Sequence, residues 1–153
     1  MTDLPYGRGG TPLQNLILSG HRSTKLTAFR LTDELDAGPI YLKADLSLDG
    51  SAQQIYERAD RLSTDMIQRL VRRPVLPQPQ VGEPTLFERR TPEQSELPEA
   101  AALDQIYDWI RMLDAEGYPH AFVDHGPHRI EFRNATRSGD ALTASVHIVT
   151  RST

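Results

Sequence analysis

An acidic turn between two apolar segments holds the densest group of residues that could do chemistry. It carries three carboxylates, Asp33, Glu34 and Asp36, ahead of Gly38. In α/β proteins active sites gather at turns that end strands, and a carboxylate there can orient or deprotonate a nucleophile. Taken alone, the turn is more typical of a solvated loop closed by an Asx hydrogen bond, with Gly38 at positive φ. The residues of this turn therefore favour the solvated loop unless another motif supports a site.

A glycine-rich segment near the start could hold an anion. Residues 1–11 predict a loop with no strand, and Gly7-Arg8-Gly9-Gly10 leads into a short helix at 13–18, with Thr11 as N-cap and Pro12 at its first position. Free amides at a helix N-terminus, the helix dipole and a guanidinium would all attract a negative group. The segment matches neither a dinucleotide-binding fingerprint nor a Walker loop. An ordinary flexible turn remains the alternative.

Three histidines and an aspartate lie close together later in the chain, at His120, Asp124, His125 and His128. Such groups can bind metals, but this run contains turn residues and no second cluster completes a coordination sphere. The chain has no cysteine, which excludes disulfides, thiolate nucleophiles and zinc–thiolate sites. We expect a polar hairpin loop here and no metal site. His21 and His147 are expected on the surface.

The charge balance is mildly acidic, with 17 Lys and Arg against 21 Asp and Glu and a net charge of −4. Proteins that bind nucleic acid by bulk phosphate neutralisation are normally basic, so this class loses weight. No apolar run is long enough for a transmembrane helix or for the core of a signal peptide. We expect a cytoplasmic protein that does not enter a membrane.

Hydrophobic periodicity predicts the elements that hold the acidic turn. A strand at 25–31 precedes it, and a strand at 40–48 follows it with apolar–polar alternation. Ser51 and Gln54 form a capping-box pattern that opens a helix ending before Pro74. One apolar stripe of this helix would face the core; its members are Ile55, Ala59, Leu62, Met66 and Leu70.

The second half of the chain changes character. Six of the eleven prolines fall within residues 74–98 and predict an extended linker without regular structure. A helix at about 100–113 follows, then two strands at about 129–134 and 142–149, joined by a turn at 138–140. The expected class is a mixed α/β protein.

Two motifs carry a more specific indication. The segment Asp3–Gln14, DLPYGRGGTPLQ, resembles the segment that follows the catalytic histidine in folate-dependent formyltransferases. That family includes methionyl-tRNA formyltransferases and sugar amine N-formyltransferases. The segment Thr32–Ile40, TDELDAGPI, resembles the family's Leu-Asp-x-Gly-Pro turn, in the same order and about 25 residues further on. A weaker similarity links residues 110–122 to the helix and the Pro-x-Ala-Phe segment that open the family's C-terminal domain.

The resemblance implies a division of the chain into three parts. Residues 1–73 would form the C-terminal half of a Rossmann-like formyltransferase domain. Residues 74–98 would be the proline-rich linker. Residues 99–153 would form a helix and a small, partial β-rich C-terminal domain.

The resemblance also implies an activity, the transfer of a formyl group from 10-formyltetrahydrofolate to a primary amine. By this resemblance Asp36 is catalytic. The turn would form part of the pterin-binding wall of the donor site, through Thr32, Asp33, Glu34 and Leu35. Substrate contacts would come from Arg8, Gly9 and Gly10. The acidic balance favours a small amine or an amino sugar over tRNA, while tRNA and a homo-oligomer remain open.

One departure from the family pattern matters for activity. The family's His and Asn would stand one and three positions before Met1, and the 153 residues do not contain them there. Loss of one oxyanion donor typically costs about 10²–10³ in rate, so we expect no formyl transfer by these residues alone. Either Met1 is an internal methionine of a longer enzyme, or the chain is a non-catalytic remnant or interaction module of the same ancestry.

Overall fold

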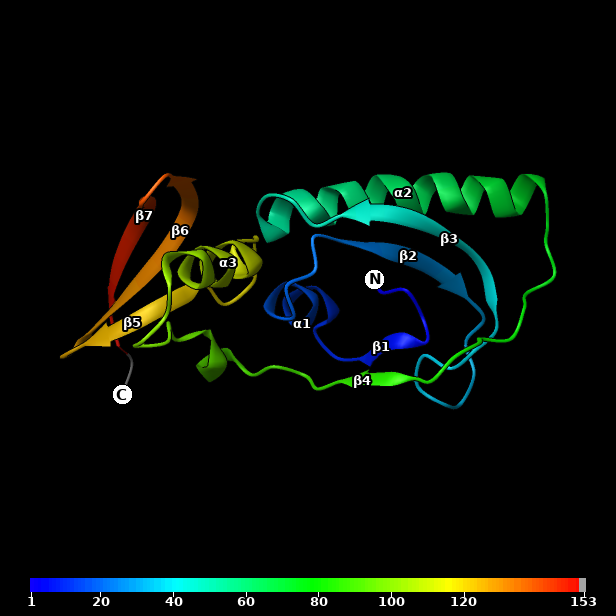
Figure 1. Ribbon diagram of the computed structural model, residues 1–153, viewed down its shortest axis with the longest axis horizontal. Coiled ribbons are helices and arrows are strands. Elements are labelled where there is room, and N and C mark those ends of the chain that lie inside the picture. Colours follow the sequence, from blue (N-terminus) through cyan, green and yellow to red (C-terminus); the bar gives the residue numbers. More distant parts are fainter. Residues whose placement is uncertain (152–153) are drawn as a thin grey trace. The chain divides into compact units, whose positions relative to one another are not determined.

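The computed structural model describes residues 1–151, which fall into two compact units. The first unit comprises Met1–Asp49 and Ile55–Arg90, and the second comprises Gly50–Gln54 and the chain from Thr91 onward. The elements, in chain order, are β1 (Tyr6–Gly9), α1 (Pro12–Leu18), β2 (Ser23–Phe29), β3 (Ile40–Ser47), α2 (Ala52–Arg72), β4 (Thr85–Phe87), the 3-10 helix η1 (Pro92–Ser95), α3 (Leu103–Leu113), β5 (Ala121–His125), β6 (His128–Ser138) and β7 (Ala141–Thr150) (Figure 1).

The first unit contains two small sheets and two helices. Strands β2 and β3 pair antiparallel, β1 and β4 pair parallel, and α2 runs along β3 (Figure 1). The combination of sheets and helices in this unit confirms the mixed α/β class predicted from the sequence. The buried apolar side chains come from α1, from the end of β3 and from one stripe of α2; they include Leu13, Leu16, Ile17, Leu46, Ile55, Ala59 and Met66.

Helix α2 begins and ends where the sequence predicts. The Ser51 N–H donates to Gln54 Oε1 at 3.1 Å and the Gln54 N–H donates to Ser51 Oγ at 3.4 Å, which is the reciprocal capping box. The helix ends at Arg72, two residues before Pro74. The predicted strand at 40–48 is confirmed as β3, because its alternation is set by local pattern.

The predicted absence of a strand within residues 1–11 is wrong. Strand β1 lies there and pairs in parallel with β4, almost eighty residues further along the chain. Gly9 fits because its φ is +109° and a Cβ in its place would lie 2.4 Å from the Phe87 carbonyl oxygen. A pairing between such distant segments has no signature in the local sequence.

The proline-rich segment holds more structure than its composition predicts. It contains β4 and η1, and before them Gln78 exchanges two backbone hydrogen bonds with Ile40 of β3, at 2.7 and 2.8 Å. The expectation of no regular structure between residues 74 and 98 is therefore wrong at these places. Because proline has no backbone N–H, residues between the prolines, such as Gln78, donate the N–H groups of this segment.

The second unit is a three-stranded antiparallel sheet, β5–β6–β7, with α3. The predicted helix begins at Leu103 rather than at residue 100, and the two predicted strands are present but longer, as β6 and β7. Their turn includes Gly139 at φ +56°. Strand β5 was not predicted, because its residues lie in the histidine-rich run that we assigned to a loop. Within residues 1–151, no helix has the length and apolarity needed to cross a membrane.

Candidate active site

The acidic turn connects β2 to β3, and its backbone is set by two residues. Asp36 has φ +52°, a left-handed conformation that aspartate tolerates better than most residues. The expectation that Gly38 takes positive φ is wrong. Gly38 is instead required by close approach, since a Cβ there would lie 1.6 Å from the Arg30 carbonyl oxygen. The Arg30 N–H donates to the Pro39 carbonyl at 2.9 Å and closes the base of the turn.

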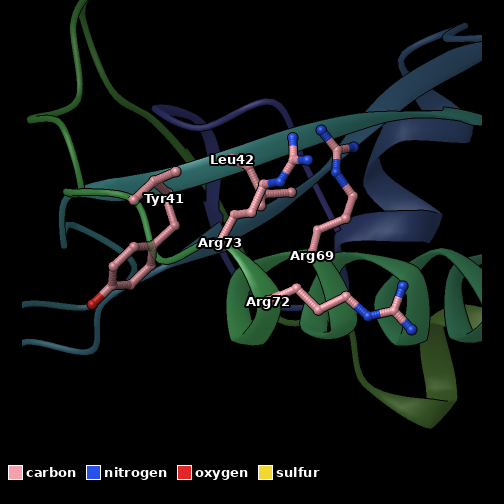
Figure 2. Close-up of a pocket in the computed structure, with 6 residues that line it drawn as sticks. Tyr41, Leu42, Arg69, Arg72 and Arg73 are labelled. Carbon is pink, nitrogen blue, oxygen red and sulfur yellow. The ribbon is translucent and has the colours of Figure 1, made fainter.

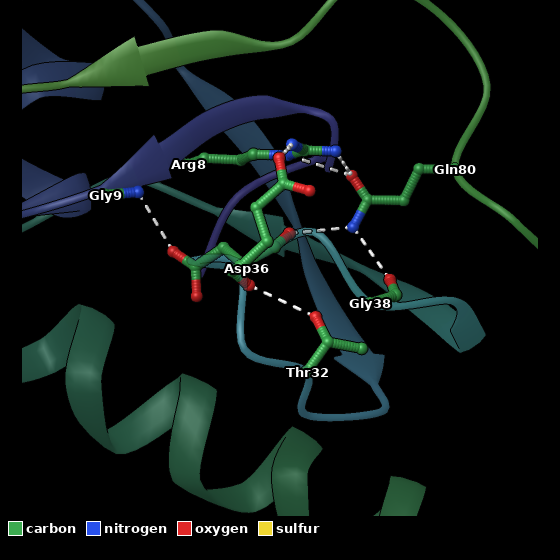
Figure 3. A network of polar contacts seen from close by, with 7 residues as sticks. Arg8, Gly9, Thr32, Asp36, Gly38 and Gln80 are labelled. Atoms are coloured by element: carbon green, nitrogen blue, oxygen red, sulfur yellow. Dashed lines mark hydrogen bonds and ion pairs between the residues drawn. The ribbon is translucent and has the colours of Figure 1, made fainter.

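Three segments that are distant in sequence meet at Asp36 (Figure 3). Its Oδ2 accepts a hydrogen bond from the Gly9 N–H of β1 at 2.9 Å. The side-chain amide of Gln80 donates to the carbonyl oxygens of Asp36 and Gly38, at 2.8 Å each. The left-handed Asp36 is thus held by contacts on both its side chain and its backbone, which stabilise this less common conformation.

Arg8 completes this network. Its Nε and Nη2 donate to Gln80 Oε1 at 3.2 and 2.9 Å, and its Nη1 lies 3.1 Å from Glu34 Oε1. The Arg8 side chain is 12% exposed, while that of Glu34 is 76% exposed. The ion pair contributes little because one partner is solvated, so the main effect of Arg8 is to orient Gln80.

The α-amine of Met1 is near enough to Asp36 for their charges to interact. Burial lowers the pKa of the Met1 α-amine, and the nearby charge of Asp36 acts in the opposite direction. Thr2 is buried, and its carbonyl accepts a hydrogen bond from Thr27 Oγ1 at 2.6 Å. The residues that enter β1 are therefore held against β2.

The amides of the glycine-rich segment are engaged in the structure. The Gly9 N–H binds Asp36, and the Gly10 N–H donates to the Phe87 carbonyl at 2.9 Å. Thr11 occupies the N-cap position of α1 and Pro12 follows it, as the sequence predicts, but Thr11 has φ +40° and its hydroxyl accepts the Arg90 N–H instead of a helix amide. The expectation that these amides are free for an anion is wrong in this state, because β4 and Asp36 use them. Substrate contacts by Arg8, Gly9 and Gly10 stay a prediction.

The remaining turn residues lie toward solvent. Thr32 Oγ1 donates to the Glu34 carbonyl at 3.1 Å, and the side chains of Thr32, Asp33 and Leu35 are exposed. Leu35 is 66% exposed, an apolar side chain next to the Asp36 carboxylate in sequence. A role of these residues in a pterin-binding wall stays a prediction.

The histidines are arranged differently from the expectation of a polar loop. His125 and His128 face each other at the tight turn between β5 and β6, and Asp124 accepts two hydrogen bonds from Arg129, at 2.9 and 3.0 Å. His21 was expected on the surface, but it is half-buried, and its Nε2 lies 2.9 Å from the Tyr6 hydroxyl oxygen. In the part of the chain that the structure describes, no three His, Cys, Asp or Glu residues gather closely enough to hold a metal ion.

Sequence reasoning missed Gln80, which contacts Arg8, Asp36 and Gly38. It stands between prolines in a segment that we interpreted as a linker. A glutamine in an extended, polar run carries no local signal of such a contact. Only the tertiary structure shows that this segment passes close enough to the acidic turn for Gln80 to make these contacts.

The fold and the site together define a mixed α/β protein whose acidic turn follows a strand and is tied to a glycine-rich segment. Comparison with known proteins supports the family resemblance seen in the sequence. Residues 92–149 match the family model described as the C-terminal domain of methionyl-tRNA formyltransferase. A solved methionyl-tRNA formyltransferase from Clostridium thermocellum is 47% identical, with a TM-score of 0.96, and the alignment covers 99% of this chain and 67% of that one. The chain belongs to the formyltransferase family, and this relative is of the methionyl-tRNA type.

More distant relatives agree on the fold. The methionyl-tRNA formyltransferase of Leifsonia xyli subsp. xyli is 27% identical over 142 residues, which are 89% of this chain and 47% of that protein. HypX from Aquifex aeolicus, solved with tetrahydrofolic acid, is 18% identical with a TM-score of 0.65 over 84% of this chain and 24% of that one. The chain spans about half the length of the curated relatives it matches.

Proposed function

We propose that this chain contributes the catalytic carboxylate, Asp36, to a site that transfers a formyl group from 10-formyltetrahydrofolate to an amine. The observation that carries the proposal is the network that holds Asp36, whose Oδ2 accepts the Gly9 N–H at 2.9 Å and whose carbonyl oxygen accepts from Gln80 at 2.8 Å. By the resemblance, the residue that would precede Met1 is the catalytic histidine. The hydrogen bond from Gly9 joins Asp36 to the segment that, by the same resemblance, follows the catalytic histidine, which supports the proposal.

The chemistry requires charge stabilisation and proton transfer. The amine attacks the formyl carbon, an oxyanion develops, and the folate nitrogen leaves as the amine loses a proton. Preorganised donors stabilise the oxyanion, and a carboxylate positions an imidazolium and relays protons. In this scheme the Gly9 amide and Gln80 hold Asp36 in place. Thr32, Asp33, Glu34 and Leu35 would contact the donor, and Arg8, Gly9 and Gly10 the substrate side.

We propose methionyl-tRNA as the acceptor. The 47% identity over 99% of the chain supports it. The overall acidic charge had favoured a small amine or amino sugar, but the charge is unevenly spread. The first unit carries 12 of the 17 Lys and Arg residues against 11 acids, whereas the second carries 5 against 10. The acidic excess therefore belongs to the second unit, and the unit with Asp36 is close to neutral.

A chimera tests the function directly. This chain would replace the aligned part of the Clostridium thermocellum enzyme, and formylation of methionyl-tRNA and of a small amino sugar would be measured. We expect activity with methionyl-tRNA, a loss of at least about 10²-fold in the Asp36→Ala chimera, and normal activity in Asp60→Asn, an exposed carboxylate on α2. Near-normal turnover by Asp36→Ala would contradict the role of Asp36.

The acceptor and the catalytic role are tested separately. Faster formylation of the amino sugar than of methionyl-tRNA would restore the small-amine acceptor while leaving Asp36 in place. Residues 1–153 by themselves should show no turnover, because they do not include the family's Asn and His at the expected positions. Turnover by these residues alone would show that other groups stabilise the oxyanion. A cytoplasmic location remains part of the proposal.

A further inference from the structure

A hollow with a volume of about 430 Å³ opens in the first unit, between the start of β3 and the end of α2 (Figure 2). Its lining residues are Tyr41, Leu42, Arg69, Arg72, Arg73 and Val75. None of them takes part in the network around Asp36. The hollow is therefore a second feature of the unit, distinct from the proposed catalytic carboxylate.

Three guanidinium groups surround this hollow without a protein partner. Arg69 and Arg73 are four residues apart, and Figure 2 shows their side chains extending to the same side of α2, toward β3, while Arg72 extends separately. All three are exposed. Within residues 1–151, none of these side chains makes a hydrogen bond or an ion pair. Three like charges thus border one concave surface.

A carboxylate, Asp65, lines an adjoining hollow of about 360 Å³ that shares Arg69 and Arg72 with the first hollow. Asp65 does not line the first hollow. The macrodipole of α2 favours basic residues in the last turn of the helix. Like charges four residues apart, such as Arg69 and Arg73, nevertheless repel each other and destabilise a helix. A bound anion at the Arg73 end would remove that repulsion.

The geometry points to phosphate as this anion: we propose that the hollow binds two neighbouring phosphate groups, from a nucleic-acid strand or from a free nucleotide. Guanidinium groups present planar pairs of donors that match phosphate oxygens. The volume lies within the range of about 300–1,000 Å³ typical of small-molecule sites. Leu42 and Val75 form an apolar wall that a sugar could contact.

Binding measurements on the full chain test the proposal. One arm measures the affinity for fluorescein-labelled, unacylated tRNA by anisotropy at several salt concentrations, and the other measures ADP by calorimetry. The variants are Arg69→Gln and Arg73→Gln. The matched control is Arg61→Gln, which removes an equally exposed positive charge from the same helix. Circular dichroism checks that every variant keeps its helix content.

We expect each of Arg69→Gln and Arg73→Gln to weaken binding about 10-fold or more, and Arg61→Gln to change it less than 2-fold. If tRNA is the source of the phosphates, each lost contact lowers the slope of log affinity against log salt by about 0.7–0.9, and ADP binds weakly. If a free nucleotide is the source, ADP binding shows the arginine dependence and tRNA binding does not.

Two outcomes would overturn the proposal. Equal losses in the Arg61 control and the two pocket variants would mean that only the general field of the unit attracts anions. No arginine-dependent binding of either probe would mean that these side chains serve the end of the helix alone. The measurement needs neither formyl donor nor acceptor amine. A failed formyl-transfer assay and a failed binding assay are therefore separate results.

Discussion

Gln80 is the residue whose removal tests the architecture of the site most sharply. Its side chain makes four hydrogen bonds: it donates to the carbonyls of Asp36 and Gly38, and it accepts from two nitrogens of Arg8. In Gln80→Ala these partners turn to water, because the site is only partly buried. At about 0.5–1 kcal/mol for each of the four net hydrogen bonds, the lower part of the usual range because the site is only partly buried, the expected cost is about 2–4 kcal/mol.

The loss should be greatest at the turn itself. Native-state hydrogen exchange of the Gly9 amide, which binds Asp36 Oδ2, reports opening of this contact. If opening of the turn controls exchange of the Gly9 amide, a destabilisation of the turn by about 2–4 kcal/mol lowers the protection factor of this amide roughly 30- to several hundred-fold. Amides of β6 in the second unit should keep their protection.

Gln78→Ala is the matched control for this measurement. Gln78 lies two residues away in the same extended segment and is exposed. Its side chain makes a single 3.4 Å contact with the nearby Leu76 carbonyl. Its backbone hydrogen bonds with Ile40 do not depend on the side chain. A change of less than 3-fold in Gly9 protection for Gln80→Ala, or the same change for both variants, would refute the conclusion that Gln80 holds the turn.

Two further predictions follow from the geometry of the turn and from the ion pair in the second unit. Gly38→Ala should destabilise the first unit by more than about 3 kcal/mol, because the new Cβ would overlap the Arg30 carbonyl oxygen. The control Gly139→Ala, where a Cβ would meet open space, should cost only about 1 kcal/mol. Equal losses of unfolding free energy for the two variants in urea would contradict this prediction. The hydrogen bond from Arg129 lowers the pKa of Asp124 below 3.8, so its stabilising effect is full above about pH 4 and is lost as the pH falls through the lowered pKa. A carboxyl NMR titration should show this pKa rise toward the ordinary range in Arg129→Gln, with the remaining lowering due to Arg151, whose Nε lies 3.3 Å from Asp124 Oδ2. An unchanged pKa would refute the assignment to Arg129.

Local pattern was sufficient for the elements that frame the site. The capping box at Ser51, the stripe on α2 and the alternation of β3 depend on neighbours within a few residues. The hairpin of β6 and β7 was predictable for the same reason, although its strands extend further than their apolar residues. The resemblance in the segment Thr32–Ile40 directed attention to Asp36, where composition alone favoured a solvated loop.

Contacts between distant segments were beyond the reach of local pattern. The pairing of β1 with β4, and the four hydrogen bonds of Gln80, join residues more than forty positions apart. They also decide that Asp36, and not Gly38, takes the left-handed conformation. The local sequence carries no signal that distinguishes the arginines at 69, 72 and 73 from other exposed charges. The strand beside α2 makes them the border of a hollow.

The sequence by itself thus determined the local elements, the acidic turn and, through two motifs, the family to which comparison assigns the chain. Tertiary structure alone decided which groups surround Asp36 and which cations face a common cavity. The physical reason is one of range. Propensity, capping and amphipathic periodicity act between residues within a few positions of each other. Strand pairing and side-chain networks depend instead on chain closure over tens of residues, and short segments do not encode it.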